Sequence, residues 1–187
     1  MAETATRLLG AYEIQNYVKF LDVDTESGYF RFTEVNSFEV EAETEDYETE
    51  YIDKKNQTKY AMGKTVSVEF ETDAMLPGQL QAQLLKREDE FNVPVEYVRT
   101  STYDPKTDAF VENTALAAKH AKGALTVKPL TAESGSPAKI SGTLSISDDF
   151  DYGTFNETTN TYTPESEVTV QAASNKANSS SSTSSKD

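Results

Sequence analysis

Cysteine and tryptophan are missing from this chain of 187 residues, and basic residues are scarce. The chain contains 17 lysines and arginines and 32 aspartates and glutamates. The lack of cysteine excludes disulfides and thiolate metal sites. The formal net charge of −15 repels phosphates at a distance. This charge argues against a sequence-reading DNA-binding protein and against attraction to anionic membranes.

Long apolar runs are also missing. No stretch approaches the roughly 20 apolar residues that a membrane-spanning helix needs. The first ten residues, MAETATRLLG, lack the basic start and apolar core of a signal peptide. We therefore expect a protein that is made and folded in a cytosol.

Groups that carry catalysis are few. His120 is the one histidine, so a paired-histidine metal site is excluded. The sequence spacing supports no aspartate–histidine–nucleophile arrangement, and we expect His120 to be a structural or exposed residue. No glycine-rich phosphate loop is present. We expect no enzyme, no metal and no cofactor. An alternative is a glycosidase with two facing carboxylates, although the usual tryptophan sugar platform is missing. Its candidate residues are Glu69 and Glu71, opposite Glu41 or Glu43.

Two long alternating segments, 37–52 and 58–72, dominate the sequence. Residues on one side are apolar, and residues on the other side are mostly glutamates, as in the pairs Val40 and Glu41 or Val68 and Glu69. Because side chains alternate between the faces of a strand, the segments predict a hairpin with one apolar face and one carboxylate face. The consecutive acids Glu45 and Asp46 break the alternation, which predicts a bulge.

The rest of the chain predicts further strands and one helix. Alternation predicts strands at residues 12–20, 29–35, 95–99, 138–147 and 167–171. Residues 79–91 favour a helix with Leu80, Leu84 and Phe91 on its apolar face and the charged segment 86–90 in water. The alanine-rich segment 115–124 has high helix propensity. The strand pattern beside it and Gly123 favour a strand instead, which we expect.

These elements predict a mainly-β protein, either a β-sandwich or a partly closed barrel with one flanking α-helix. Residues 1–10 are expected to form an N-terminal arm, and residues 11–172 a single domain. Residues 173–187 are serine-rich and contain no apolar residue larger than alanine. Such a segment buries too little to offset its ordering entropy, so we expect a disordered tail.

Two groups of residues resemble a known family. The first is Tyr51-Ile-Asp53-Lys-Lys, followed by Gly63, the alternating segment 65–70 and a helix. The second is Gly142-Thr-Leu144, Gly153-Thr-Phe155-Asn156 and Thr161-Tyr-Thr-Pro164. Their order, over most of residues 12–172, is similar to the tail tube (major tail) proteins of long-tailed phages, the siphoviruses, that infect Gram-positive bacteria.

The resemblance implies a structural virion protein. In that family, subunits form hexameric rings that stack into a tube, through which the tape measure protein and double-stranded DNA pass without specific binding. Tail terminator and distal tail proteins lie at the ends of the tube. The implied location is the virion tail, after assembly in the host cytoplasm, with no membrane partner.

Carboxylates that line such a tube repel the DNA backbone, so that DNA slides without sticking. The expected lumen-lining residues are Glu39, Glu41, Glu43, Glu48, Glu50, Glu69 and Glu71. The basic loop between the two strands is expected to contact an acidic patch of the adjacent ring. Its residues are Asp53, Lys54, Lys55, Asn56, Gln57 and Lys59.

Other classes of protein share this composition. An acidic cell-surface or adhesion module is also strand-rich, but it needs an export signal or an anchor. A tail terminator or a tube protein of a secretion system shares the general plan of the tail tube. The adhesion module, the tail terminator and the secretion-system tube protein remain as alternatives.

Overall fold

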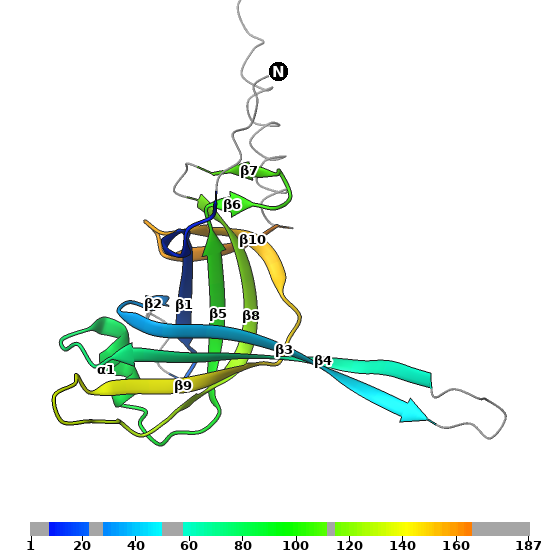
Figure 1. Cartoon of the computed structure of the whole chain (residues 1–187). Coiled ribbons are helices and arrows are strands. Elements are labelled where there is room, and N and C mark those ends of the chain that lie inside the picture. Colours follow the sequence, from blue (N-terminus) through cyan, green and yellow to red (C-terminus); the bar gives the residue numbers. More distant parts are fainter. Residues whose placement is uncertain (1–7, 23–27, 50–57, 112–114, 166–187) are drawn as a thin grey trace, which may run out of the picture. The chain divides into compact units, whose positions relative to one another are not determined.

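The computed structural model describes residues 8–22, 28–49, 58–111 and 115–165, with the backbone alone for 45–49 and 58–62 (Figure 1). Most of them lie in strands, and α1 is the one α-helix among them, which confirms the mainly-β prediction. The elements in order are η1 (Ala11–Glu13), β1 (Ile14–Phe20), β2 (Phe30–Arg31), β3 (Val35–Thr49), β4 (Thr58–Asp73), α1 (Gln79–Leu85), β5 (Val93–Ser101), β6 (Tyr103–Asp104), β7 (Ala109–Phe110), β8 (Ala115–Val127), β9 (Lys139–Ile146), β10 (Asp151–Asn156) and β11 (Thr161–Pro164).

One sheet holds nine of these strands. Its main path runs β2-β1-β5-β8-β9-β4-β3, and β10 pairs with both β8 and β11. The short strands β6 and β7 pair with each other in a second sheet. The ladders β3–β4, β4–β9, β8–β9, β8–β10 and β10–β11 are all antiparallel.

The alanine-rich segment is a strand, as expected. Its first half pairs with β10, from Ala115 opposite Asn156 to His120 opposite Asp151. Its second half pairs with β9. In these ladders the N–H and C=O groups of β8 form hydrogen bonds with the neighbouring strands. This tertiary context overrides the helix propensity of alanine.

The structure has strands at the other predicted positions that it describes, although some of them differ from the prediction in length. The expected strand at residues 29–35 is reduced to Phe30–Arg31. Glu34 has a φ of 54°, a left-handed conformation that does not continue a strand. The expected strand at 167–171 lies outside the described residues.

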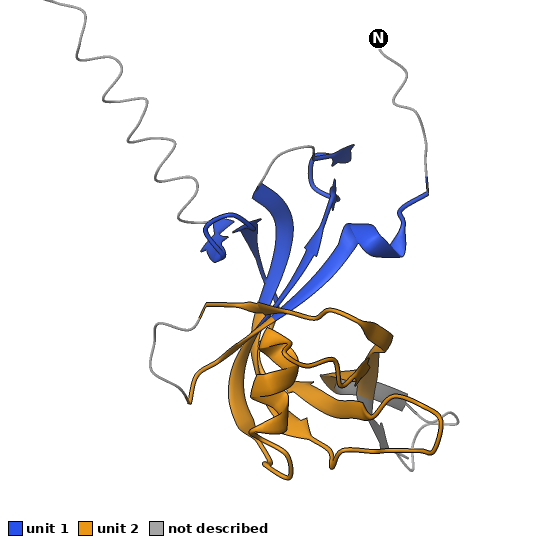
Figure 2. Cartoon of the chain, turned by 90° about the vertical axis from the view of Figure 1, so that its left-hand side faces the viewer, with its two compact units in different colours: residues 1–17, 97–120, 150–187 blue, residues 18–96, 121–149 orange. Residues whose placement is uncertain are grey.

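The chain forms two compact units (Figure 2). Unit 1 comprises residues 1–17, 97–120 and 150–187. Its core includes Phe155, which is fully buried and lies 4.5 Å from the ring of Tyr17, centroid to centroid. Tyr97 is also buried there, and its hydroxyl donates a 2.7 Å hydrogen bond to Oδ1 of Asn16. Burial raises the pKa of Tyr97 well above its usual range.

Unit 2 comprises residues 18–96 and 121–149. Here α1 packs against β2 and β9 and buries Leu80 and Leu84. The helix ends at Leu85 rather than near residue 91, and Phe91 is 76% exposed, so its predicted place on the apolar face is wrong. Positive φ values at Asp89 and Asn92 take the chain out of the helical path before Phe91 reaches that face.

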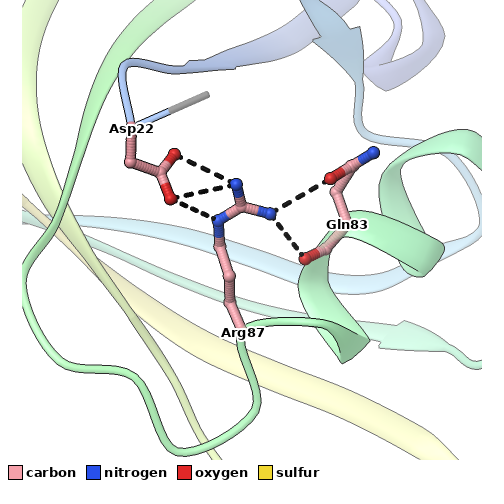
Figure 3. A network of polar contacts seen from close by, with 3 residues as sticks. All are labelled: Asp22, Gln83 and Arg87. Carbon is pink, nitrogen blue, oxygen red and sulfur yellow. Dashed lines mark hydrogen bonds and ion pairs between the residues drawn. The ribbon is translucent and has the colours of Figure 1, made fainter. Parts of the chain in front are cut away.

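Arg87 lies just after α1 and is buried, contrary to the prediction that the segment 86–90 stays in water. Its Nε and Nη2 donate hydrogen bonds of 3.1 and 3.0 Å to the carboxylate of Asp22 (Figure 3). Its Nη1 donates to the main-chain oxygen and Oε1 of Gln83, both at 3.1 Å. The guanidinium also lies 4.2 Å from the ring centroid of Phe20. These partners replace the water that a buried cation loses.

We expect Arg87→Met to lower the free energy of unfolding by about 2 kcal/mol, because it removes the ion pair and the contact with Phe20. Asp22 is partly exposed and can be hydrated after the change, so the cost stays below that of a fully buried pair. Urea unfolding measures the difference. Lys86→Met is the matched control, since Lys86 is exposed, and it should change stability by less than about 0.5 kcal/mol. Equal losses in the two variants would contradict the stabilising role of the network.

Candidate functional site

The polar face of the β3–β4 hairpin carries several carboxylates among the described residues. Glu39, Glu41, Glu43 and Glu69 are exposed on it, and Glu71 is partly exposed. The register places Glu39 directly opposite Glu69. Like charges directly opposite each other on a sheet are destabilising, so this face is not arranged to stabilise the isolated hairpin.

Small hydroxyl side chains continue this polar face onto the next strand. β9 pairs with β4 so that Ser141, Thr143 and Ser145 lie opposite Glu71, Glu69 and Ser67. These serines and threonine are exposed or partly exposed. The sheet therefore presents a hydrophilic surface across three adjacent strands, with the carboxylates on β3 and β4.

One end of the acidic face is partly neutralised. Nζ of Lys139 lies 2.6 Å from Oε1 of Glu71, and both side chains are more than one third exposed. The hydrogen bond and the charge of Glu71 raise the pKa of Lys139. Nearby, Nδ2 of Asn36 donates a 2.6 Å hydrogen bond to Oδ1 of Asp73. Glu71 therefore contributes less net negative charge to the face than Glu39, Glu41 and Glu43.

The apolar face of the hairpin is buried only at its base. Phe38 and Phe70 lie in register, and the ring of Phe32 packs against both, with centroid distances of 5.4 and 5.0 Å. Farther along the strands, Val40 is 41% exposed and Ala42 is exposed. The predicted two-faced pattern is present, but its outer half has no covering layer among the described residues.

The hairpin also extends beyond its neighbour in the sheet. β9 ends at Ile146, opposite Val66, whereas the β3–β4 ladder continues to Thr49 and Thr58 (Figure 1). Beyond Val66 the hairpin is a two-stranded ribbon. β3 is the last strand in the sheet order, so its outer edge has no strand partner within the described residues. A long unpaired edge is a template for pairing with another chain.

The predicted bulge is confirmed, and the pairing of carboxylates considered for a glycosidase is wrong. The ladder shifts between Glu45, which faces Gly63, and Asp46, which faces Ala61. Glu69 faces Glu39 and Glu71 faces Ser37, so neither lies opposite Glu41 or Glu43. Alternation determines only which face each side chain occupies, so registers that differ by an even number of residues satisfy the pattern equally.

Several predicted site residues cannot be placed. Glu48 and Lys59 are opposite each other on the backbone ladder, and their side chains are not described. The remaining members of the two predicted sets lie outside the described residues. They are Glu50, Asp53, Lys54, Lys55, Asn56 and Gln57.

The described residues offer little for other chemistry. No group of three or more histidines or acids within them is arranged to hold a metal ion. None of their helices is long and apolar enough to cross a membrane. His120 stacks on Tyr162 with a centroid distance of 4.6 Å and an interplanar angle of 17°. Burial raises the pKa of Tyr162 to about 12, so it stays a neutral ring at physiological pH.

No family model matches the sequence, and no curated protein is similar to it in sequence. Solved structures are similar in fold. The SPP1 tail tube matches with a TM-score of 0.56 and 10% identity over 74% of this chain and 76% of that chain. The fold is that of tail tube proteins.

Two further structures carry a related fold. The sheath/tube terminator of the extracellular contractile injection system PVC matches with a TM-score of 0.50 and 10% identity, over 80% of this chain and 99% of that chain. The tail of an empty GTA particle with C6 symmetry matches with a TM-score of 0.50 and 6% identity, over 78% and 98%. At these identities the tail tube likeness concerns the fold alone.

Sequence reasoning missed a cleft in unit 1 of this tail tube fold. Lys106, Lys119 and Tyr152 line it together with Ala117 and Glu165. These residues come from distant parts of the sequence, and none belongs to a motif. The signal available was the presence of the basic residues Arg99, Lys106 and Lys119 in a chain with a strong excess of acids.

Proposed function

We propose that the chain is a structural subunit of a phage tail tube, which stacks as rings into a conduit for the genome. The observation that carries this proposal is the two-stranded ribbon of β3 and β4. One of its faces is acidic, its outer edge is unpaired among the described residues, and it belongs to a chain with the fold of tail tube proteins. No catalytic step is part of this role.

The unpaired edge of β3 supports ring formation. Pairing with a neighbouring copy satisfies the open N–H and C=O groups, and a closed ring leaves no open edge. The exposed part of the apolar face, at Val40 and Ala42, would be covered by a layer from a neighbouring subunit in the ring. We propose six subunits in each ring, by analogy with the C6 symmetry of the GTA tail.

The acidic face supports a lumen through which DNA passes. Repulsion between carboxylates and phosphates reaches about 8 Å at physiological salt, so the acids must face the channel to act on DNA. We propose Glu39, Glu41, Glu43 and Glu69 as its main groups, with a smaller part for Glu71 because of Lys139. Glu48 and Glu50 complete the proposed set. The tape measure protein and double-stranded DNA would pass without specific binding.

The basic loop at residues 53–57, with Lys59, is proposed to join adjacent rings. We expect the double variant Lys54→Glu and Lys55→Glu to fold normally and to form no tubes, because both charges of the contact are reversed. Circular dichroism checks the fold, and electron microscopy counts tubes. The matched control reverses Lys122 and Lys128, two exposed lysines outside the loop. Normal tubes from the loop variant would refute the contact.

The remaining assignments follow from this role. We place the protein in the virion tail of a long-tailed phage of Gram-positive bacteria, after assembly in the host cytoplasm. Tail terminator and distal tail proteins would be its partners at the ends of the tube. Residues 1–10 and 173–187 are proposed as an N-terminal arm and a disordered tail on either side of the domain at 11–172.

A tube terminator is a second candidate function. The match with the PVC terminator extends over 99% of the terminator chain, with a TM-score of 0.50. A terminator ring caps a tube and does not stack on copies of itself. The two roles therefore differ in whether the purified chain builds more than one ring.

Negative-stain electron microscopy of the concentrated and aged protein tests the proposal. We expect hollow tubes of uniform bore that lengthen with time. Single rings that never stack would favour the terminator. Particles with neither rings nor tubes, even in the presence of an assembled tail tip, would refute a role in the tube.

A further inference from the structure

Unit 1 contains an open cleft of about 490 Å³ with an apolar floor and a cationic mouth. Val111 and Ala117 are apolar, partly buried lining residues, and they define the floor. At the mouth, two ammonium groups lie close to the ring of Tyr152. Nζ of Lys106 is 5.1 Å from its centroid, and Nζ of Lys119 is 5.3 Å from it. The Tyr152 side chain is 44% exposed, so the mouth is open to solvent.

Three cations, Arg99, Lys106 and Lys119, and two acids, Asp104 and Glu165, line the cleft, so the lining carries a small net positive charge. Lys106 forms an ion pair with Glu165. No ion pair joins Lys119 or Arg99, which both line the cleft, to a carboxylate within the described ranges. Positive charge beside an apolar floor fits an extended peptide in which acidic and apolar side chains alternate.

The chain itself has such a segment next to the cleft. Residues 166–171 read Ser-Glu-Val-Thr-Val-Gln, so Val168 and Val170 alternate with Glu167 and Thr169. In an extended conformation the two valines lie on one side. Glu165 lines the cleft, so this segment starts at its mouth.

We propose that residues 166–171 bind in the cleft of their own subunit, with Val168 and Val170 on the apolar floor and Glu167 near Lys119. A segment tethered directly at the mouth has an effective concentration in the millimolar range. A second copy of the chain in dilute solution is present at far lower concentration. The tethered segment therefore occupies the cleft in preference to a segment from another copy. The cleft lies in unit 1 and the acidic ribbon in unit 2, so this inference does not depend on the role of the ribbon.

Disulfide trapping in the full-length chain tests the proposal, because the natural chain has no cysteine. The double variant Ala117→Cys and Val168→Cys places one thiol on the floor and one on the segment. We expect an intramolecular disulfide that forms at a rate independent of protein concentration and is visible as a faster monomer band on a non-reducing gel. If circular dichroism shows that Ala117→Cys does not fold, Val111→Cys replaces it.

Two matched changes in this cysteine variant separate binding from simple tethering. Val170→Asp should slow disulfide formation about tenfold, because it puts a charge on the apolar floor. Thr169→Asp adds the same charge on the other side of the segment and should change the rate less than about twofold. Lys119→Glu should also slow the reaction, whereas Lys122→Glu, on the same strand, should not.

Equal rates in the Val170→Asp and Thr169→Asp variants would show that the segment only collides with the cleft, which overturns the proposal. Disulfides that join two copies, at a rate that rises with protein concentration, would assign the cleft to a second copy and also overturn it.

Discussion

Replacing four exposed acids of the β3–β4 hairpin by lysine should turn a tube that excludes DNA into one that retains it. The variant carries Glu39→Lys, Glu41→Lys, Glu43→Lys and Glu69→Lys. Six copies around a lumen would present a ring of cations, and binding would release counterions from the phosphates. We expect affinity for double-stranded DNA to fall by about 10³- to 10⁵-fold between 50 and 200 mM salt, as for about 6–10 phosphate contacts. Co-sedimentation of tubes with short duplexes measures it.

The matched control changes the net charge equally at exposed acids outside the hairpin. Glu90, Glu133, Asp148 and Asp149 serve this purpose, each replaced by lysine. We expect control tubes to bind DNA weakly and only on their outer surface, where added nuclease still degrades it. Equal, nuclease-sensitive binding by both variants would place the acidic face on the outside of the tube.

Gly142→Val should cost about 3 kcal/mol of unfolding free energy and lower the melting temperature by about 6–12 °C. A Cβ at Gly142 would lie 2.7 Å from the main-chain oxygen of Thr126 and 2.7 Å from Cζ of Phe70. The oxygen belongs to the β8–β9 ladder and cannot move without breaking it. The ring belongs to the cluster with Phe32. Thermal unfolding followed by circular dichroism measures the change.

Ser141→Val is the matched control for this prediction. Ser141 is the neighbouring residue of β9 and belongs to the polar face opposite Glu71, so valine gains strand propensity there without a clash. Its stability should stay within about 0.5 kcal/mol of the natural chain. A similar loss in both variants would show that the polar face, rather than the contact between Gly142 and Phe70, limits stability.

The hairpin shows how far the sequence determines structure. Alternation predicted both faces, and the pair Glu45 and Asp46 predicted the bulge, because each depends only on neighbouring residues. The register was not predictable, since pairing Glu69 with Glu39 or with Glu43 leaves every side chain on the same face. Contacts with a residue outside the hairpin, such as those of Phe32 with Phe38 and Phe70, distinguish the two.

The charged end of α1 and the cleft of unit 1 escaped prediction for a related reason. Arg87 is buried because Asp22 and Gln83 satisfy its donors, and Asp22 lies 65 positions earlier in the chain. Lys106, Lys119 and Tyr152 meet only after β8 and β10 pair. Such constellations depend on tertiary contacts that no local pattern records.

The carboxylates of β3 and β4, with the hydroxyls of β9 beside them, have a consequence for small ions. A wall of fixed negative charge acts as a cation exchanger, since mobile cations accumulate within about 8 Å of it and mobile anions are depleted. Rings of acidic side chains give channels their preference for cations. A tube lined by this face would therefore conduct potassium or sodium in preference to chloride when no DNA is present.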